Sequence, residues 1–249
     1  MNLRFSEIYN HLRLKPDVSP MQLSELNSND TRNTFIFNKL QEISLNKVDS
    51  NVCLYTDASV SNPYNRSDNG TASGGFVLDY GGDLLCGSME IYRITNYEAQ
   101  SILGSKFNTN RLASLRTAYA EWKVIENFLD MINEMIDHIK PMESIKKFII
   151  YTDSRNIEEA YLALLNDYIY YEADAVVNYL MLEIAPFLNN IEIYHVKAHQ
   201  FDNCAIMSIP EIERYNRLAD ELCDNLYNIN GTLICKDYRM VLFRVNIGY

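Results

Sequence analysis

Val52-Cys53-Leu54-Tyr55-Thr56-Asp57 is an apolar, β-prone run that closes on a carboxylate, and its last three residues return in Tyr151-Thr152-Asp153. The second copy ends an apolar run that begins at Lys147. Such runs predict strands, and parallel neighbours bring their carboxyl ends to one edge of a sheet, about 5 Å apart. Either Asp alone is typical of a turn or a helix N-cap. The repetition favours a shared site, in which a divalent metal ion offsets the repulsion between the two carboxylates.

The residues that follow the first run predict an antiparallel meander. After a polar loop, Gly74–Leu78 reads as a second strand and Leu84–Ile94 as a third. Tyr80-Gly81-Gly82-Asp83 between them is typical of a hairpin turn.

A long amphipathic helix is expected from Leu112 to Ile139, where apolar residues recur at spacings of three and four and Pro141 stops the pattern. A coiled-coil seam is the alternative, although Ala118 and Trp122 suit packing on a sheet better. Glu121 falls roughly 70° from the centre of the apolar stripe. Its position alone is typical of an exposed helix residue, but from the flank it could lean over the edge of the sheet.

The second half of the chain alternates helices with strands. Helices are expected at about 156–165 and 173–188, a strand at Ile191–Val196, and a last helix from Pro210. Strands separated by helices imply parallel pairing through right-handed crossovers. The predicted fold class is therefore α/β, a mixed five-stranded sheet with an antiparallel meander, parallel strands and helices on both faces.

Three segments are distinguished along the chain. Residues 1–49 carry six basic and six acidic residues and are expected to form a helical N-terminal extension that packs on the main domain; a separate binding module is the alternative. Residues 50–228 are expected to form the main domain, and residues 229–249 a β-prone tail. A protein partner could bind through residues 1–49 or the tail.

The composition bounds the class of protein. The chain has 249 residues, of which 47% are hydrophobic, and this excludes global disorder. Its five cysteines form no CxxC pair, and we find no signal peptide and no transmembrane segment, so a cytoplasmic, reduced environment is expected. The net charge of −11 argues against nucleic-acid binding unless a strong motif overrides it.

Five motifs together resemble the type 1 ribonuclease H family, over about residues 50–228. Two further acidic motifs and a histidine loop join the two Tyr-Thr-Asp strings. The motifs are Leu54-Tyr55-Thr56-Asp57-Ala58-Ser59 with Ser73-Gly74-Gly75-Phe76, Ala120-Glu121-Trp122, Ile150-Tyr151-Thr152-Asp153-Ser154, Val196-Lys197-Ala198-His199, and Asn216-Arg217-Leu218-Ala219-Asp220-Glu221-Leu222. Each motif alone is weakly specific, whereas five in the family's order form a specific pattern.

The resemblance implies a ribonuclease H-like fold and a two-metal endonuclease that hydrolyses the RNA strand of an RNA/DNA hybrid. It assigns two Mg²⁺ ions, or Mn²⁺ in their place, to Asp57, Glu121, Asp153 and Asp220, with Asp57 bridging both. His199 would assist proton movement or product release. Substrate contacts are expected from Ser59, Arg116, Ser154, Arg155, Lys197 and Asn216, with Arg217 adding to the basic patch.

The chain departs from the family pattern around the substrate. A Thr109-Asn110-Arg111 string resembles the polar cluster before the helix carboxylate, but in that register Ala113 would take the carboxylate's place. Asp167–Glu172 is acidic and aromatic where some members have a basic handle. These departures leave two alternatives open, a nuclease of the same superfamily with a different nucleic-acid substrate and a non-catalytic binding scaffold.

Overall fold

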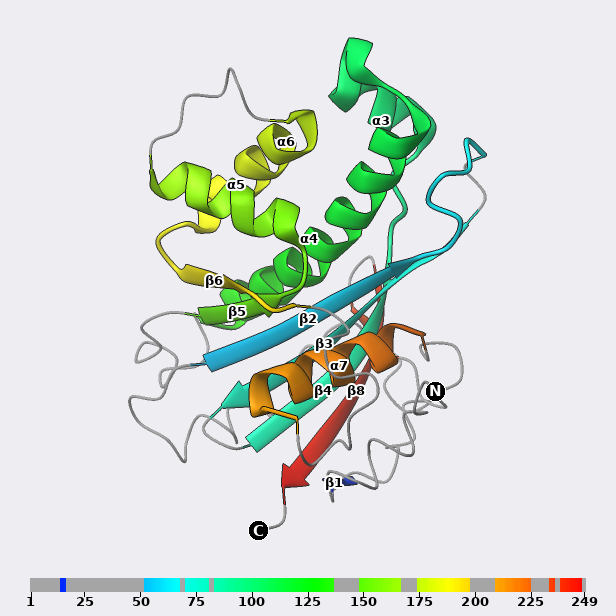
Figure 1. The fold of residues 1–249 in the computed structure, drawn as a ribbon. Coiled ribbons are helices and arrows are strands. Elements are labelled where there is room, and N and C mark those ends of the chain that lie inside the picture. The colour runs from blue at the N-terminus through cyan, green and yellow to red at the C-terminus, as the bar shows by residue number, and fades with distance from the viewer. Residues whose placement is uncertain are drawn as a thin grey trace.

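The computed structural model describes residues 14–16, 52–67, 70–80, 83–136, 148–166, 174–197, 209–224, 233–235 and 238–247. Its centre is a mixed sheet (Figure 1). The five central strands are β2 (Val52–Val60), β3 (Ala72–Tyr80), β4 (Asp83–Ile91), β5 (Phe148–Thr152) and β6 (Ile191–His195). They lie in the order β4-β3-β2-β5-β6, with β2, β3 and β4 antiparallel and β5 and β6 parallel to β2. The predicted mixture of an antiparallel meander and parallel strands is present, which confirms the α/β fold class.

The repeated Tyr-Thr-Asp strings lie side by side. Tyr55 pairs in register with Tyr151, and Tyr151 with Tyr194 on β6. Their rings stack across the sheet, with centroids 4.8 and 5.8 Å apart. Residues in register on neighbouring strands point to the same face, so the repeated string places equivalent side chains next to each other.

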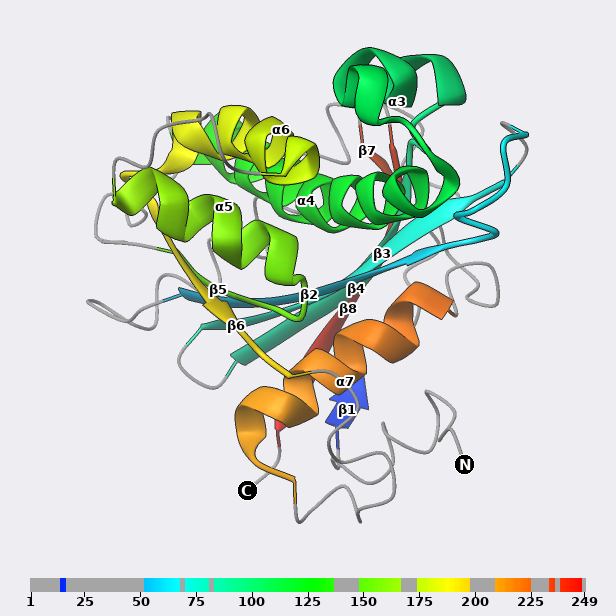
Figure 2. The same cartoon turned by 45° about the horizontal axis from the view of Figure 1, so that its top comes forward.

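Helices cover both faces of the sheet, as expected (Figure 2). One face carries α4 (Thr109–Ile136), α5 (Arg155–Leu165) and α6 (Ala175–Ile184), and the other carries α7 (Glu211–Asp224). The core includes Phe128 of α4, whose ring packs against Phe76 and Phe148 from the sheet. Within the described residues, no helix is both long and apolar enough to cross a membrane.

Adjacent glycines on β3 let helices approach from both sides. A Cβ on Gly74 would lie 2.1 Å from a methyl group of Val124 on α4. A Cβ on Gly75 would lie 2.0 Å from the carbonyl oxygen of Ala219 on α7. Because successive strand residues face opposite sides, two glycines in a row admit one helix on each face.

The first half of the chain differs from the sequence expectation in two places. A helix not foreseen, α3 (Asn96–Leu103), follows β4, which ends at Ile91 instead of Ile94. The cause is local: Thr95 and Glu98 form a capping box that starts α3. Asp57 was expected to end its strand, but β2 continues to Val60 because residues 57–60 keep pairing with β3.

The second half matches the expected elements more closely, with shifted ends. The expected helix at 173–188 is α6 followed by the short 3-10 helix Ala185–Phe187, which contains Pro186. A second 3-10 helix, Gly104–Lys106, follows α3. The C-terminal end of the long expected helix, beyond Ile136, lies outside the described residues.

Both terminal segments contribute strands to the same sheet. Within residues 1–49 the structure describes only β1 (Leu14–Pro16); the remainder, with its expected helix, lies outside the described residues. The tail contains β7 (Leu233–Cys235) and β8 (Tyr238–Ile247). β8 pairs with β4, β1 and β7, so the sheet extends past the expected domain boundary at residue 228.

Candidate metal centre

Three carboxylates from distant parts of the chain meet at the ends of neighbouring strands. Asp57 lies within β2, Asp153 directly follows β5, and Glu121 comes from α4. β5 ends at the pair Thr56–Thr152, so Asp57 projects just past the end of its parallel neighbour. One oxygen of each carboxylate lies within 4.8 Å of the others. Three carboxylate oxygens at this separation could hold a metal ion.

The backbone at Ala58 organises two of these carboxylates. Its N–H donates to Oδ1 of Asp57 at 2.7 Å and to Oε1 of Glu121 at 2.9 Å. Glu121 is only 2% exposed, and its Oε2 is buried with no hydrogen-bond partner in the part of the chain that the structure describes. An unsatisfied buried carboxylate oxygen is costly, and a cation would satisfy it. The donor set, all oxygen and all acidic, fits a hard divalent ion.

The electrostatics of the site favour a bound positive charge. Burial, then the charges of Glu121 and Asp153, raise the pKa of Asp57 well above its usual range. Burial, then Asp153, raise the pKa of Glu121 to about 8. Packed anions in a dry site hold protons more tightly, and a cation removes that repulsion. A bound cation would therefore lower the pKa values of both Asp57 and Glu121.

The fourth expected carboxylate, Asp220, approaches from the opposite face on α7. Its charge adds to the raised pKa values of Asp57 and Glu121, although it lies outside the group of three described above. Cys223, one turn further along α7, donates from Sγ to the carbonyl oxygen of Asp57 at 2.9 Å. Ser73 of β3 donates to the carbonyl oxygen of Cys223 at 2.8 Å. These bonds fix α7 against the strands that carry the site.

Cys223 and His195 are site neighbours that the motifs did not reveal. His195 ends β6, in register with Thr152, and its Nε2 lies 3.1 Å from the carbonyl oxygen of Asp153. The signal in the sequence was strand pairing: a residue that ends a strand parallel to β5 must lie near Asp153. Cys223 gave no such signal, because its contact joins residues 166 positions apart.

The expected substrate contacts divide into exposed and buried side chains. Arg155 and Lys197 are exposed. Ser59 and Ser154 are half-buried, and each lies within two residues of Asp57 or Asp153 in the sequence. Asn216 is buried on α7, one turn before Asp220. The expected histidine, His199, lies outside the described residues.

Arg116 is not presented to a substrate, contrary to the expectation for a phosphate contact. It is 1% exposed and donates to the carbonyl oxygens of Ile94, Pro63 and Asn65. A guanidinium has five N–H groups and buries readily when carbonyl oxygens accept them. Its charge is used inside the protein, to hold loops together.

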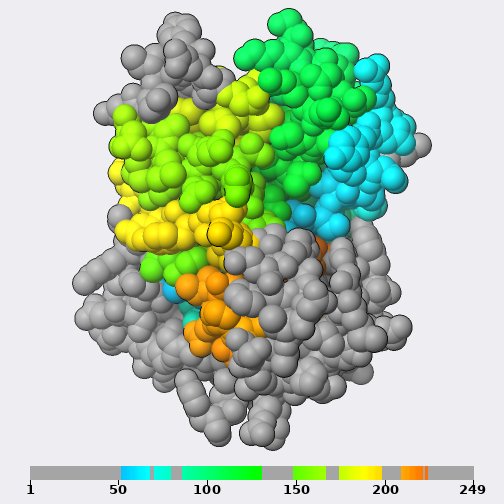
Figure 3. All heavy atoms as spheres, viewed as in Figure 1, coloured from blue at the N-terminus to red at the C-terminus, as the bar shows by residue number. Residues whose placement is uncertain are grey.

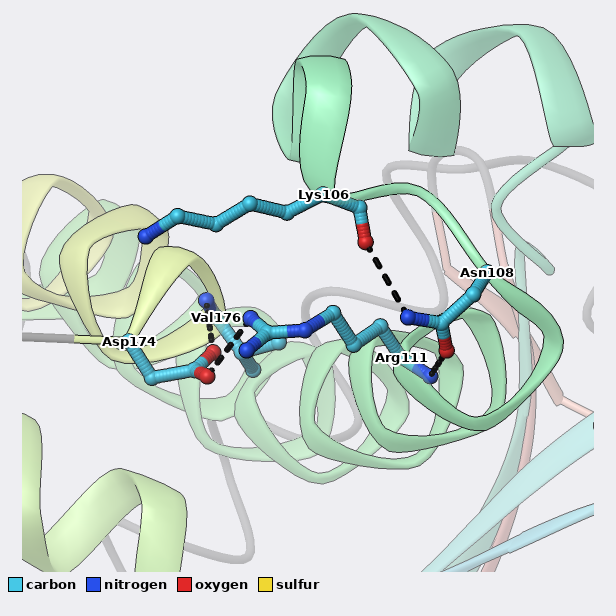
Figure 4. Close-up of polar contacts among 5 residues, drawn as sticks. All are labelled: Lys106, Asn108, Arg111, Asp174 and Val176. Carbon is cyan, nitrogen blue, oxygen red and sulfur yellow. Dashed lines mark hydrogen bonds and ion pairs between the residues drawn. The ribbon is translucent and has the colours of Figure 1, made fainter.

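The Thr109-Asn110-Arg111 string starts α4 instead of flanking a carboxylate (Figure 4). Oδ1 of Asn108 accepts from the backbone N–H of Arg111 at 3.0 Å, and Arg111 forms an ion pair of 2.7 Å with Asp174. Asp174 in turn caps α6 by accepting from the N–H of Val176. Arg111 thus ties the starts of α4 and α6 together.

The register question on α4 is resolved in favour of Glu121. Ala113, which the alternative register would place at the site, is a buried core residue. Glu126, five residues further along this helix, bonds to Lys123, which also contacts Glu183. Glu121 is the carboxylate of α4 that meets Asp57 and Asp153.

Comparisons with known proteins establish no family. No family model matches the chain, and no curated protein matches it. Among solved structures, it is similar to the native crystal structure of the Prototype Foamy Virus protease-reverse transcriptase, with a TM-score of 0.37 and 16% identity. The similarity covers 74% of this chain and 22% of that one, so this chain spans about a fifth of that protein.

Proposed function

We propose that the protein is a metal-dependent endonuclease that hydrolyses the RNA strand of RNA/DNA hybrids. One observation carries the proposal: Asp57, Glu121 and Asp153 converge on a buried point where an oxygen of Glu121 has no protein partner among the described residues. The five motifs that resemble type 1 ribonuclease H supply the substrate class. Two Mg²⁺ ions are the proposed cofactors, with Mn²⁺ as a substitute.

The roles of the carboxylates are proposed by analogy with type 1 ribonuclease H. Asp57, held by the N–H of Ala58 and central among the acidic groups, is proposed to touch both ions. Asp153 would complete the site on the water side, and Glu121 and Asp220 the site on the leaving-group side. The bound ions would supply an activated water and neutralise charge on the leaving oxygen. His199, four residues after the end of β6 in sequence, is proposed to carry a proton away.

The protein itself contributes orientation and exclusion of water. The shared Ala58 donor keeps Asp57 and Glu121 in one geometry, and the Cys223 bond fixes the backbone behind Asp57. Preorganised charged groups lose little energy to reorganisation as charge develops in the transition state. Arg155 and Lys197, both exposed, are proposed to contact substrate phosphates.

The first test is cleavage of an end-labelled RNA/DNA hybrid with Mg²⁺ or Mn²⁺. We expect the wild type to cut the RNA strand, and Asp57→Asn or Asp153→Asn to lower the rate by at least about a hundredfold, because each removes a charge that holds metal. Asp130→Asn, an exposed carboxylate on α4, is the matched control and should cut normally. Absence of cleavage by the wild type with both metals would refute the enzyme assignment.

Parallel reactions with single-stranded RNA, duplex RNA and duplex DNA separate the proposed substrate from its alternatives. Preferential cutting of another substrate would indicate a different nuclease of the superfamily. Binding without cutting of any of the four would indicate a binding scaffold.

A second test is calorimetric titration of Mg²⁺ into the metal-free protein. We expect the wild type to bind Mg²⁺, and we expect Glu121→Gln to lower the affinity about tenfold or more. The reason is that the buried oxygen without a partner loses its charge. Glu126→Gln is the control on the same helix, since Glu126 is bonded to Lys123. Equal isotherms for Glu121→Gln and the wild type would contradict the assignment of Glu121.

A further inference from the structure

A buried arginine joins two segments beside the metal centre. Arg116 donates through Nε to the carbonyl oxygen of Ile94 at 3.3 Å and through Nη1 to those of Pro63 and Asn65. Its Nη2 lies 3.4 Å from Oδ1 of Asn96. One side chain therefore binds the loop after β2 to the segment that leads into α3.

A second buried arginine repeats this connection from the other segment. Arg93, 8% exposed, donates through Nη2 to the carbonyl oxygen of Asn62 at 2.9 Å. A Cβ on Gly70 would lie 1.5 Å from Nη1 of Arg93, so the loop also closes on this arginine at its far end. Two guanidinium groups that each span both segments make this part of the surface a fixed frame.

The frame presents three exposed tyrosines. Tyr64, Tyr92 and Tyr97 are 63%, 60% and 81% exposed, and we call them the tyrosine platform. Tyr64 lies between the two loop residues that Arg116 binds, and Tyr97 follows Asn96. The hydroxyl of Tyr92 is 3.2 Å from Oε2 of Glu98. These aromatic rings are therefore carried on backbone that the two arginines hydrogen-bond.

A basic side chain borders the platform. The guanidinium of Arg66, two residues after Tyr64, lies over the ring of Phe107 at 5.9 Å, whereas the side chain of Lys106 extends toward the start of α6 (Figure 4). The space-filling view shows the loop surface, in cyan, adjoining the surface of α3 and the start of α4, in green (Figure 3). Aromatic rings next to cations are the combination that binds single-stranded nucleic acid, through base stacking and phosphate contacts.

The platform lies close to the metal centre along both elements that support it. Its loop begins one residue after β2 ends, four residues beyond Asp57. On α4, Arg116 precedes Glu121 by five residues, about 7.5 Å along the axis. The platform is therefore supported by the same two elements, β2 and α4, that carry Asp57 and Glu121.

We propose that the tyrosine platform binds unpaired nucleotides that continue from the strand held at the metal centre. This inference rests on the proposed function. The bases stack on Tyr64, Tyr92 and Tyr97, while Arg66 contacts a phosphate. The protein thereby prefers hybrids with a single-stranded extension over blunt hybrids of the same sequence.

The test compares fluorescence anisotropy of a blunt hybrid with that of hybrids extended at either end of either strand. The Asp57→Asn protein is used with Mg²⁺, so that the substrate stays intact. We expect one extension to tighten Kd by roughly fivefold or more, since each stacked base strengthens binding by a sizeable factor. Tyr64→Ala/Tyr97→Ala in that background should abolish the difference, whereas Tyr64→Phe/Tyr97→Phe should keep it.

Leu182→Ala, which changes an exposed apolar residue on α6, is the control and should keep the difference. Equal Kd values for blunt and extended hybrids would overturn the proposal, as would equal losses in the Phe and Ala double variants. These outcomes are separate from failure of the proposed function, which is decided by cleavage with the wild type.

Discussion

At the residue scale, the carboxylates of Asp57 and Glu121 share a single backbone donor, the N–H of Ala58. A stability-optimised fold would not gather three acidic groups at this separation, two of them buried, because their charges repel and their desolvation is costly. The raised pKa values of Asp57 and Glu121 are the measure of this cost. Residues that are unfavourable for stability and converge on one point are typical of a functional site.

This cost predicts how stability depends on pH. Because the pKa of Glu121 rises from 4.5 to about 8 on folding, the folded state holds the proton more tightly than the unfolded state. The stability that the protonated Glu121 contributes to the folded state is fully present below about pH 4.5. It is lost as pH rises toward 8, by roughly 1.4 kcal/mol per pKa unit. Thermal unfolding in EDTA should show the loss, and Mg²⁺ should restore more stability at pH 8 than at pH 6.

Glu121→Gln is the control for this prediction. It keeps the shape of the side chain but has no charge to desolvate, so its stability should vary less with pH and respond less to Mg²⁺. A wild-type protein whose metal-free stability is constant between pH 5 and about pH 8 would contradict the pKa shift.

At the element scale, the site depends on two helices held at a fixed distance on opposite faces of β3. α4 brings Glu121 and α7 brings Asp220, and each passes over one of the paired glycines, Gly74 or Gly75. A side chain on either glycine would displace a helix and the carboxylate that it carries. Close approach of helix to sheet is thus a condition of the chemistry.

The two glycines should differ in their tolerance of substitution. Gly75→Ala directs its Cβ at the backbone carbonyl of Ala219, which cannot rotate away, and we expect a loss of about 2–3 kcal/mol in unfolding free energy. Gly74→Ala meets a methyl group of Val124, and the added change Val124→Ala should recover part of its loss. Urea unfolding of the variants measures both effects, and equal tolerance at the two sites would contradict the packing described.

At the scale of the whole molecule, the net charge of −11 opposes a polyanionic substrate. Four acidic residues belong to the proposed metal site, and −11 + 4 leaves −7 for the remainder. Arg116, expected to contact phosphate, is used internally instead. Attraction to nucleic acid then depends on the bound metals and on a few exposed cations, such as Arg155 and Lys197.

We therefore expect the protein to bind nucleic acid weakly and in a salt-sensitive way. If about three phosphates are neutralised by protein cations, affinity for the hybrid should fall by roughly one to two orders of magnitude between about 50 and 200 mM salt. Anisotropy of the inactive Asp57→Asn protein over this range measures the slope. Tight binding that is independent of salt would show that the surface charges are not the limiting factor.

The sequence by itself determined the strands, the helix faces and the carboxylates of the site. Hydrophobic periodicity is a local property and can be read from the sequence. The repeated Tyr-Thr-Asp string also indicated how the two strands align, and β2 and β5 pair in that register. The sequence analysis did not predict α3, because a capping box can start a short helix without a long apolar pattern.

Only the tertiary structure decided how each polar side chain is used. Arg116 was expected to contact the substrate, and Arg111 belongs to a string that resembles the family's polar cluster. In the structure the first binds backbone carbonyls and the second pairs with Asp174, 63 residues away. Cys223 entered the site through a bond to Asp57 across 166 residues. The physical reason is that local sequence fixes the period of an element, whereas the partner of a charged or polar group depends on which elements the fold brings together.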